Sequence, residues 1–308
     1  MIKFMEKWRK KYFGKKSYWQ LYVLAFIPFL FVLIFNYVPM YGIVLAFKDF
    51  RIRKGILGSP WAGLKYFEQL FRTPIFPTIL KNTIVLSLES LLIGFPIPIL
   101  LALAFNEIKS YRVKKILQTI SFAPYFISTV VVVSILFQMF SYRYGVVNAT
   151  RGVLGMESVD FLGKGSFFRP SYILSSVWQS AGYGSVLYIA ALSAVDTSLY
   201  EAAAIDGATR FQRVIHVDLP CIAPTIIITL ILNAGNILSL GFEKAYLMQN
   251  ALNYNTSEII ATYVYKTGIE QAQFSFSTAV GLFNAVINAI ILLIVNKMAD
   301  KISGTSLF

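Results

Sequence analysis

The sequence predicts an all-α membrane protein with six transmembrane helices, and two observations support this prediction. First, 56% of the 308 residues are hydrophobic and only 14% are charged, whereas a soluble domain carries roughly 25% charged residues. Second, a helix that crosses a bilayer needs about 20 mostly apolar residues, and six segments meet this requirement. They are about 19–41, 83–105, 116–140, 172–195, 222–240 and 274–295.

The first apolar segment lies in a stretch without charged residues, 17–47. It is too long for the apolar core of a signal peptide and no small-residue cleavage site follows it, so we expect it to remain as a transmembrane helix. The second segment contains Glu89 and two prolines, and the third has Pro124 near its start. Glu89 is either a functional group or a partner for another helix of the bundle.

The distribution of Lys and Arg predicts the orientation in the cell membrane. Seven basic residues and one acidic residue lie in the first sixteen, which places the N-terminus in the cytoplasm. Six spans then place 106–115, 196–219 and the C-terminus on the same side. The outer loops become 48–81, 141–170 and 243–273, although 48–81 also carries seven basic residues. Within it, 64–71 has helical apolar spacing and either lies along the membrane surface or packs as a short connector.

Several enzyme classes are excluded because the chain contains one cysteine and one histidine, Cys221 and His216. An internal disulfide, a cysteine zinc site and a histidine-dependent triad all need more. The nucleotide-binding pattern GxxxxGK[ST] is also missing from the sequence. We therefore expect a chain that is not an enzyme, binds no cofactor or metal of its own and does not bind nucleic acid.

The most informative segment lies between the fourth and fifth apolar segments. Ser198 and Glu201 have the spacing of a capping box, which predicts the start of a helix. Gly207 predicts its end, because glycine tolerates the left-handed conformation found at helix ends. Taken singly, Glu201 and Gly207 need have no role beyond capping and ending this helix.

A second helix is predicted directly after the bend. Thr209 and Gln212 repeat the capping spacing. Pro220 suits the first turn of the fifth apolar segment, where its missing N–H would have no partner. The segment therefore predicts helix, bend and helix on the cytoplasmic side.

This segment resembles the EAA loop of bacterial ABC importer permeases. Glu201-Ala202-Ala203 is followed after three residues by Gly207, and after nine more by Val217-x-Leu219-Pro220. Valine stands at 217 where the family usually has isoleucine. Flanking features resemble the carbohydrate-uptake branch, and the likeness covers about 80–300. These features are Asn82-Thr83, Ala123-Pro124-Tyr125, Trp178, Tyr183 and Phe242-Glu243.

The resemblance implies the type I importer fold and a set of partners. In such permeases the loop docks on a separate ATPase, which uses ATP and magnesium. It implies an ATPase dimer, a second and usually non-identical permease, an extracytoplasmic solute-binding protein and a saccharide, with oligosaccharides expected. The coupling residues it implies are Glu201, Ala202, Ala203, Gly207, Leu219 and Pro220.

The expected domain organisation follows from the spans and the resemblance. We expect a basic cytoplasmic N-terminus at 1–18 and a first transmembrane helix with its outer loop at 19–79. A permease core at 80–300 contains the coupling loop at 196–220, and 301–308 forms a cytoplasmic tail.

Polar side chains in the spans indicate a candidate substrate path, because such groups avoid lipid and face protein or water. One set should share a face of the fifth span, and the other should offer aromatic rings and polar tips at the outer end of the fourth. Ordinary interhelical hydrogen bonds and an aromatic interface belt explain them equally well. The two sets are Asn233, Asn236 and Glu243, and Trp178, Gln179 and Tyr183.

Two other transporter classes remain as alternatives. An ion-coupled secondary transporter or channel should show several acidic residues within the membrane and paired interrupted helices. Only Glu89 lies clearly within a predicted span, which counts against this class. An ABC permease for a solute other than a sugar also remains open.

Overall fold

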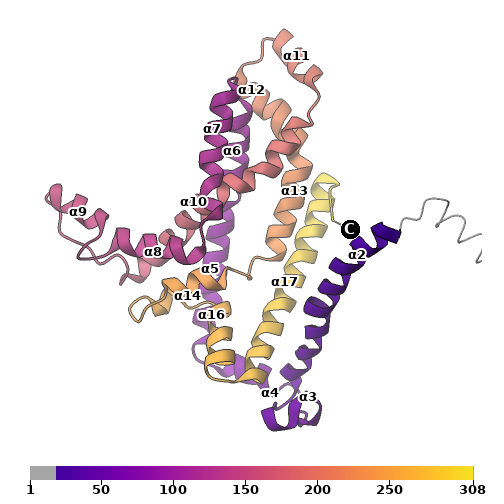
Figure 1. Cartoon of the computed structure of the whole chain (residues 1–308), viewed down its shortest axis with the longest axis vertical. Coiled ribbons are helices and arrows are strands. Elements are labelled where there is room, and N and C mark those ends of the chain that lie inside the picture. The colour runs from indigo at the N-terminus through magenta and orange to yellow at the C-terminus, as the bar shows by residue number, and fades with distance from the viewer. Residues whose placement is uncertain (1–18, 308) are drawn as a thin grey trace, which may run out of the picture.

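The computed structural model describes residues 19–307, so the basic segment 1–18 lies outside the described residues (Figure 1). Within 19–307 the structure is helical, and its β-pairing is limited to one isolated bridge between Lys48 and Trp61. The prediction of an all-α fold is confirmed.

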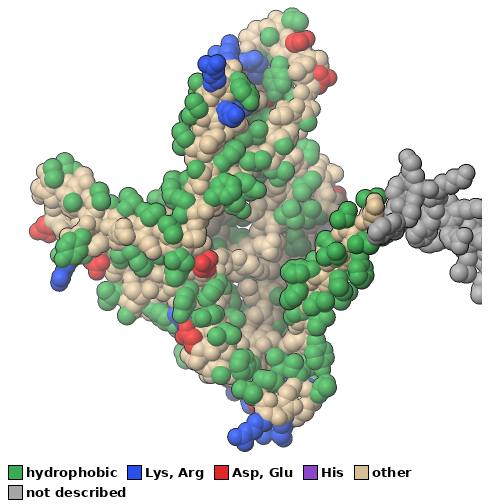
Figure 2. All heavy atoms as spheres, viewed as in Figure 1, with side chains coloured by type: hydrophobic (Ala, Val, Ile, Leu, Met, Phe, Trp, Pro, Cys, Tyr) green, Lys and Arg blue, Asp and Glu red, His purple; other side chains and the backbone are tan. Residues whose placement is uncertain are grey.

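The described part of the chain opens with three consecutive helical segments. α2 (Trp19–Val32) continues through a π-helical turn, η1 (Leu33–Tyr37), into a 3-10 helix, η2 (Val38–Phe47). α2 carries exposed apolar side chains along its length and leans away from the other long helices (Figures 1 and 2). The segment 48–75 contains η3 (Ile52–Lys54), α3 (Gly55–Gly58) and α4 (Lys65–Arg72).

α4 covers most of 64–71, the stretch expected either to lie along the membrane surface or to pack as a short connector. Its Leu70 is fully buried among Phe76, Ile79 and Val280, while Leu64 and Phe71 are exposed. The helix therefore packs on the bundle, as a connector does, and leaves part of its apolar surface uncovered.

The remaining helices form the bundle and its lateral elements. They are α5 (Phe76–Gly94), α6 (Pro96–Asn106), α7 (Tyr111–Phe122), η4 (Ala123–Phe126), α8 (Thr129–Phe140), α9 (Val146–Val153), α10 (Gly165–Ser193), α11 (Thr197–Ile205), α12 (Arg210–Arg213), η5 (Val214–Asp218), α13 (Leu219–Gly235), α14 (Phe242–Met248), α15 (Tyr254–Ser257), α16 (Ile260–Tyr265), η6 (Lys266–Glu270) and α17 (Phe274–Ser303).

Four helices of residues 19–307 are long and apolar enough to cross a membrane: Gln20–Phe47, Phe76–Asn106, Arg210–Gly235 and Phe274–Ser303. The bent pair α7–η4 and α8 makes a fifth if it is one span. α10 covers most of the predicted fourth span, 172–195, and starts earlier, at Gly165. Seven serines and Arg169 lower its hydropathy, so it is not among these four helices.

The prediction of one continuous helix over 116–140 is wrong. The helix axis turns by 96° between η4 and α8. Pro124 lies in the 3-10 turn, Ile127 is extended, and the side chain of Ser128 accepts the N–H of Val131 to cap a new helix. α8 and α9 therefore project sideways from the bundle (Figure 1).

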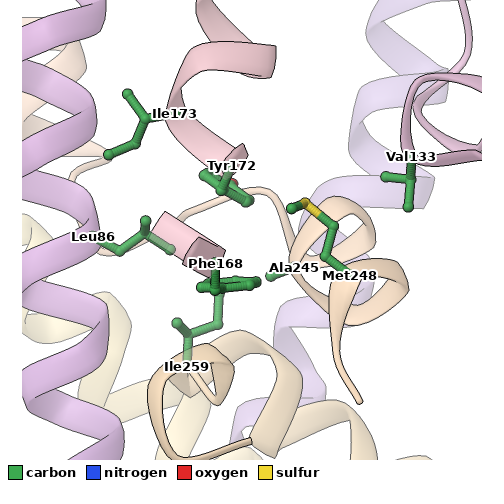
Figure 3. Close-up of a cluster of buried hydrophobic side chains, with 8 residues drawn as sticks. All are labelled: Leu86, Val133, Phe168, Tyr172, Ile173, Ala245, Met248 and Ile259. Carbon is green, nitrogen blue, oxygen red and sulfur yellow. The ribbon is translucent and has the colours of Figure 1, made fainter. Parts of the chain in front are cut away.

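The core consists of three clusters that surround α10 and α17. The cluster in Figure 3 joins α5, α8, α10, α14 and the start of α16 through Leu86, Val133, Phe168, Tyr172, Ile173, Ala245, Met248 and Ile259. A second lies between α4, α5, α16 and α17, and a third between α6, α10 and α13. At Gly182 of α10, a Cβ would collide with the backbone carbonyl of Ser121, so this glycine permits α7 to approach.

Candidate functional site

The predicted helix–bend–helix lies at one tip of the molecule, here called the α11 end (Figure 1). α11 stops at Ile205, and Gly207 takes the left-handed conformation with φ +73°. Thr209 and Gln212 form the predicted capping box of α12. Pro220 occupies the first turn of α13, also as predicted.

The predicted capping box of α11 is wrong. The helix begins at Thr197, and the N-cap is Asp196, whose Oδ1 accepts the backbone N–H of Ser198 at 2.9 Å. The aspartate stands two residues before Ser198 and accepts its backbone N–H, and Glu201 is left exposed. This hydrogen bond lowers the pKa of Asp196.

The surface of this tip exposes two large apolar side chains beside charged ones (Figure 2). Ile205 is 86% exposed and Phe211 is 72% exposed. Between the two helices lies a pocket of about 430 Å³, lined by residues that include Ala202, Ala203 and Gly207. Large apolar side chains exposed around a pocket suit contact with another protein.

α11 buries none of its residues, so a polar link attaches it to the bundle. The hydroxyl of Tyr200 donates to Oδ1 of Asp218 at 2.5 Å, and Asn106 Nδ2 lies 3.4 Å from the same oxygen. Asp218 is fully buried. Burial, together with the bond to Asp218, raises the pKa of Tyr200 to about 12.

A looser ionic contact supports the same junction. The carboxylate of Glu107 lies 3.9 Å from the guanidinium of Arg213 and 4.0 Å from that of Arg210. None of these linking residues was predicted from the sequence. Asp218 fills the unspecified position of the Val217-x-Leu219 pattern, and its charge beside an apolar segment was the available signal.

A cavity of about 450 Å³ lies in the bundle between α5, α6, α10 and α13. Its wall carries hydroxyl groups, amides and a stacked pair of rings, Tyr125 and Tyr183, whose centroids are 4.0 Å apart. The Oγ atoms of Ser87 and Ser90 are buried there and have no hydrogen-bond partner within residues 19–307. The volume lies in the roughly 300–1,000 Å³ range of small-molecule sites.

Half of the predicted path residues face this cavity. Tyr183, Asn233 and Asn236 line it. The shared helix face predicted for Asn233 and Glu243 is wrong, because the helix ends at Gly235 and Glu243 lies on the separate helix α14.

The other two predicted residues of α10 lie elsewhere. Gln179 donates from Nε2 to the carbonyl of Ile127 at 2.8 Å and so holds the break before α8. Trp178 lines a separate apolar groove between α8 and α10. Neither lines the cavity.

Two charged residues, Glu89 and Lys244, lie within the bundle. Glu89 borders a different pocket beside Arg169, but the two do not form an ion pair in the described part of the chain. Lys244, on α14, is 6% exposed and went unnoticed in the sequence. No cluster of three potential metal ligands occurs within 19–307.

Known proteins with similar sequences are transport proteins. The chain matches the family described as binding-protein-dependent transport system inner membrane component over residues 94–303. It is 45% identical over 288 residues to the polygalacturonan/rhamnogalacturonan transport system permease protein YteP of Bacillus subtilis (strain 168), covering 94% of this chain and 90% of the relative. Protein LplB of the same organism is 43% identical over 294 residues, covering 96% and 92%.

Solved structures give the same result. The fold is similar to a chain of a bacterial ABC transporter involved in the import of the acidic polysaccharide alginate. That match has a TM-score of 0.85 and 41% identity, and covers 92% of this chain and 96% of the other. The alginate transporter in complex with an alginate pentasaccharide-bound periplasmic protein matches with a TM-score of 0.86 and 40% identity over 94% and 96%. The chain is a multi-pass membrane protein and belongs to the family of binding-protein-dependent transport system inner membrane components.

Proposed function

We propose that this chain is the permease subunit of an ATP-driven importer that moves saccharides, with oligosaccharides as the expected size class. The observation that carries the proposal is the exposed α11–α12 tip, which Tyr200 links to two helices that line a hydroxyl-rich cavity. The functions of two relatives, a polygalacturonan/rhamnogalacturonan permease and an alginate importer, support a saccharide as the transported solute.

The proposed topology places the α11 end and both termini in the cytoplasm. Basic residues in 1–16, 109–115 and 210–213 support this orientation. Counting α7–α8 as one broken span and α10 as another gives six spans. The proposed units remain 1–18, 19–79, 80–300 with the coupling loop at 196–220, and 301–308.

We assign the proposed partners to the two ends of the molecule. An ATPase dimer docks on α11 and α12, where Glu201, Ala202 and Gly207 lie on the exposed surface. Leu219 and Pro220 begin the helix that carries the movement inward. A solute-binding protein docks at the opposite end, and a second, non-identical permease completes the path. The partner ATPase binds ATP and magnesium, and this chain binds no cofactor.

Transport then proceeds by alternating access. The permease has two states, and the closed ATPase dimer must bind one more tightly than the other in order to shift the equilibrium. Tyr200, Asp218 and Asn106 connect the docking helix to α13 and α6, so a displacement of α11 acts on two walls of the cavity. The saccharide passes without a change in its bonds.

The test is reconstitution of the permeases with the ATPase and binding protein in liposomes. We expect saccharide to stimulate ATP hydrolysis, and Ile205→Ser with Phe211→Ser to strip the ATPase from the purified complex. Val153→Ser, which alters an equally exposed residue on α9, should retain it. Full retention and undiminished uptake in the double variant would contradict the proposal.

Orientation is tested separately on intact cells. Asp206→Cys in a Cys221→Ser background places one thiol at the exposed bend. A membrane-impermeant maleimide should leave it unlabelled until the cells are opened. Labelling from outside would overturn the proposed topology.

A further inference from the structure

Lys244 is a buried cation directly behind the cavity wall. It lies on α14, and its side chain is 6% exposed. The ammonium donates to Oγ of Ser176 at 2.9 Å and lies 5.5 Å from the ring centroid of Tyr172. Ser176 itself lines the cavity. One hydroxyl group therefore separates this cation from the cavity.

The charge of Lys244 lacks a carboxylate partner in the described part of the chain. None of the ion pairs within 19–307 includes it. Lys266, by comparison, has Oε2 of Glu258 at 2.8 Å. A buried ammonium is costly without a counterion, and a hydroxyl and a ring face compensate it only in part.

The cavity wall adds no negative charge. Its lining contains no aspartate or glutamate among the described residues. Amide groups come from Asn233 and Asn236, and the buried Oγ atoms of Ser87 and Ser90 have no hydrogen-bond partner among the described residues. A neutral polar wall with one cation behind it has a positive potential, which attracts anions.

We propose that the transported saccharide carries carboxylate groups and that Lys244 is the residue that recognises them. A uronate carboxylate in the cavity accepts a hydrogen bond from the ammonium in place of Ser176, while sugar hydroxyls bond the amide groups of Asn233 and Asn236. This inference rests on the proposed function and adds the substrate class. Lys244 acts as a specificity residue, because no bond of the solute is made or broken.

The experiment compares two probes in liposomes that contain the complete importer and its binding protein. One probe is tetragalacturonate and the other is its fully methyl-esterified form, which keeps the shape and removes the charge. The uptake rate of each variant is divided by the wild-type rate for the same probe, so the selectivity of the binding protein cancels. Lys244→Met is the test, Lys244→Arg the conservative variant, and Lys81→Met, an exposed lysine on α5, the matched control.

We expect Lys244→Met to lower tetragalacturonate uptake about tenfold, the scale of one charge-assisted hydrogen bond. Uptake of the methyl ester should be unchanged. Lys244→Arg and Lys81→Met should retain uptake of both probes. An equal loss with both probes would show that Lys244 only holds α14 in place, and no loss with either would show that it is not involved; both outcomes overturn the proposal.

The wild-type complex separates this inference from the proposed function. If it imports only the methyl ester, or neither probe, an acidic substrate is refuted. Uptake of neutral oligosaccharides with stimulated ATP hydrolysis would still support the proposed function. Absence of any saccharide-stimulated hydrolysis would refute that function itself.

Discussion

The Tyr200 hydroxyl offers the sharpest test of how the α11 end is coupled to the bundle. α11 buries no side chain, so packing contributes little to its position. Tyr200→Phe keeps the ring and removes the donor to Asp218. The buried carboxylate then retains only the longer 3.4 Å contact from Asn106.

The size of the effect follows from the bond that is lost. A hydrogen bond to a charged acceptor contributes about 1.5–3 kcal/mol, and about 1.4 kcal/mol corresponds to a tenfold change in an equilibrium. Tyr200→Phe should therefore weaken the attachment of α11 at least about tenfold. We expect ATP hydrolysis to continue while saccharide imported per ATP falls severalfold.

The assay measures uptake and hydrolysis in the same liposomes. Tyr111→Phe is the matched control, because Tyr111 is 76% exposed at the same end of the molecule. Equal uptake per ATP in Tyr200→Phe, Tyr111→Phe and wild type would refute the reasoning. A fall in both hydrolysis and protein yield would instead indicate loss of folding, which thermal unfolding of the purified complex detects.

Two further predictions concern glycines. Gly207→Val should lose ATPase binding and Gly207→Asn should retain it, because φ +73° strains a β-branched residue whereas asparagine tolerates that conformation. Co-purification of the ATPase distinguishes the two variants, and equal retention would contradict a role for the bend. Gly182→Ala should lower the melting temperature of the permease, because the added methyl group meets the backbone of Ser121. Gly281→Ala should leave it unchanged, because nothing lies within 4 Å of the added methyl group. Equal melting temperatures of the two variants would show that α7 can shift.

Features set by neighbouring residues could be predicted from the sequence. The bend at Gly207 and the capping box of Thr209 and Gln212 each depend on two to four consecutive positions, and both are confirmed. The start of α11 shows the limit of this reasoning. Asp196 and Ser198 are both good caps, and local preference does not decide between them.

Features set by tertiary contacts could not be predicted. The apolar run through 127–140 fits a straight helix or a broken one equally well, and the break depends on Gln179, 52 positions away, which bonds the carbonyl of Ile127. Likewise, apolar residues continue past Gly235, so hydropathy did not reveal the helix end that separates Glu243 from Asn233. Lys244 bonds Ser176, 68 positions away, and the neighbouring sequence gives no sign of this contact.

The polar residues of α10 that lower its hydropathy include those that line the cavity. With 29 residues, α10 is about 44 Å long at 1.5 Å per residue, enough to span a bilayer. Ser176, Ser180 and Gly184 recur at four-residue intervals on one face, and all three line the cavity. A helix that turns hydroxyls and glycine toward a water-filled path must lose hydropathy, whereas its opposite face can keep residues such as Leu174 and Trp178 against apolar surface. The low hydropathy of α10 is therefore what a cavity-lining transmembrane helix requires, and it supports counting α10 as a span.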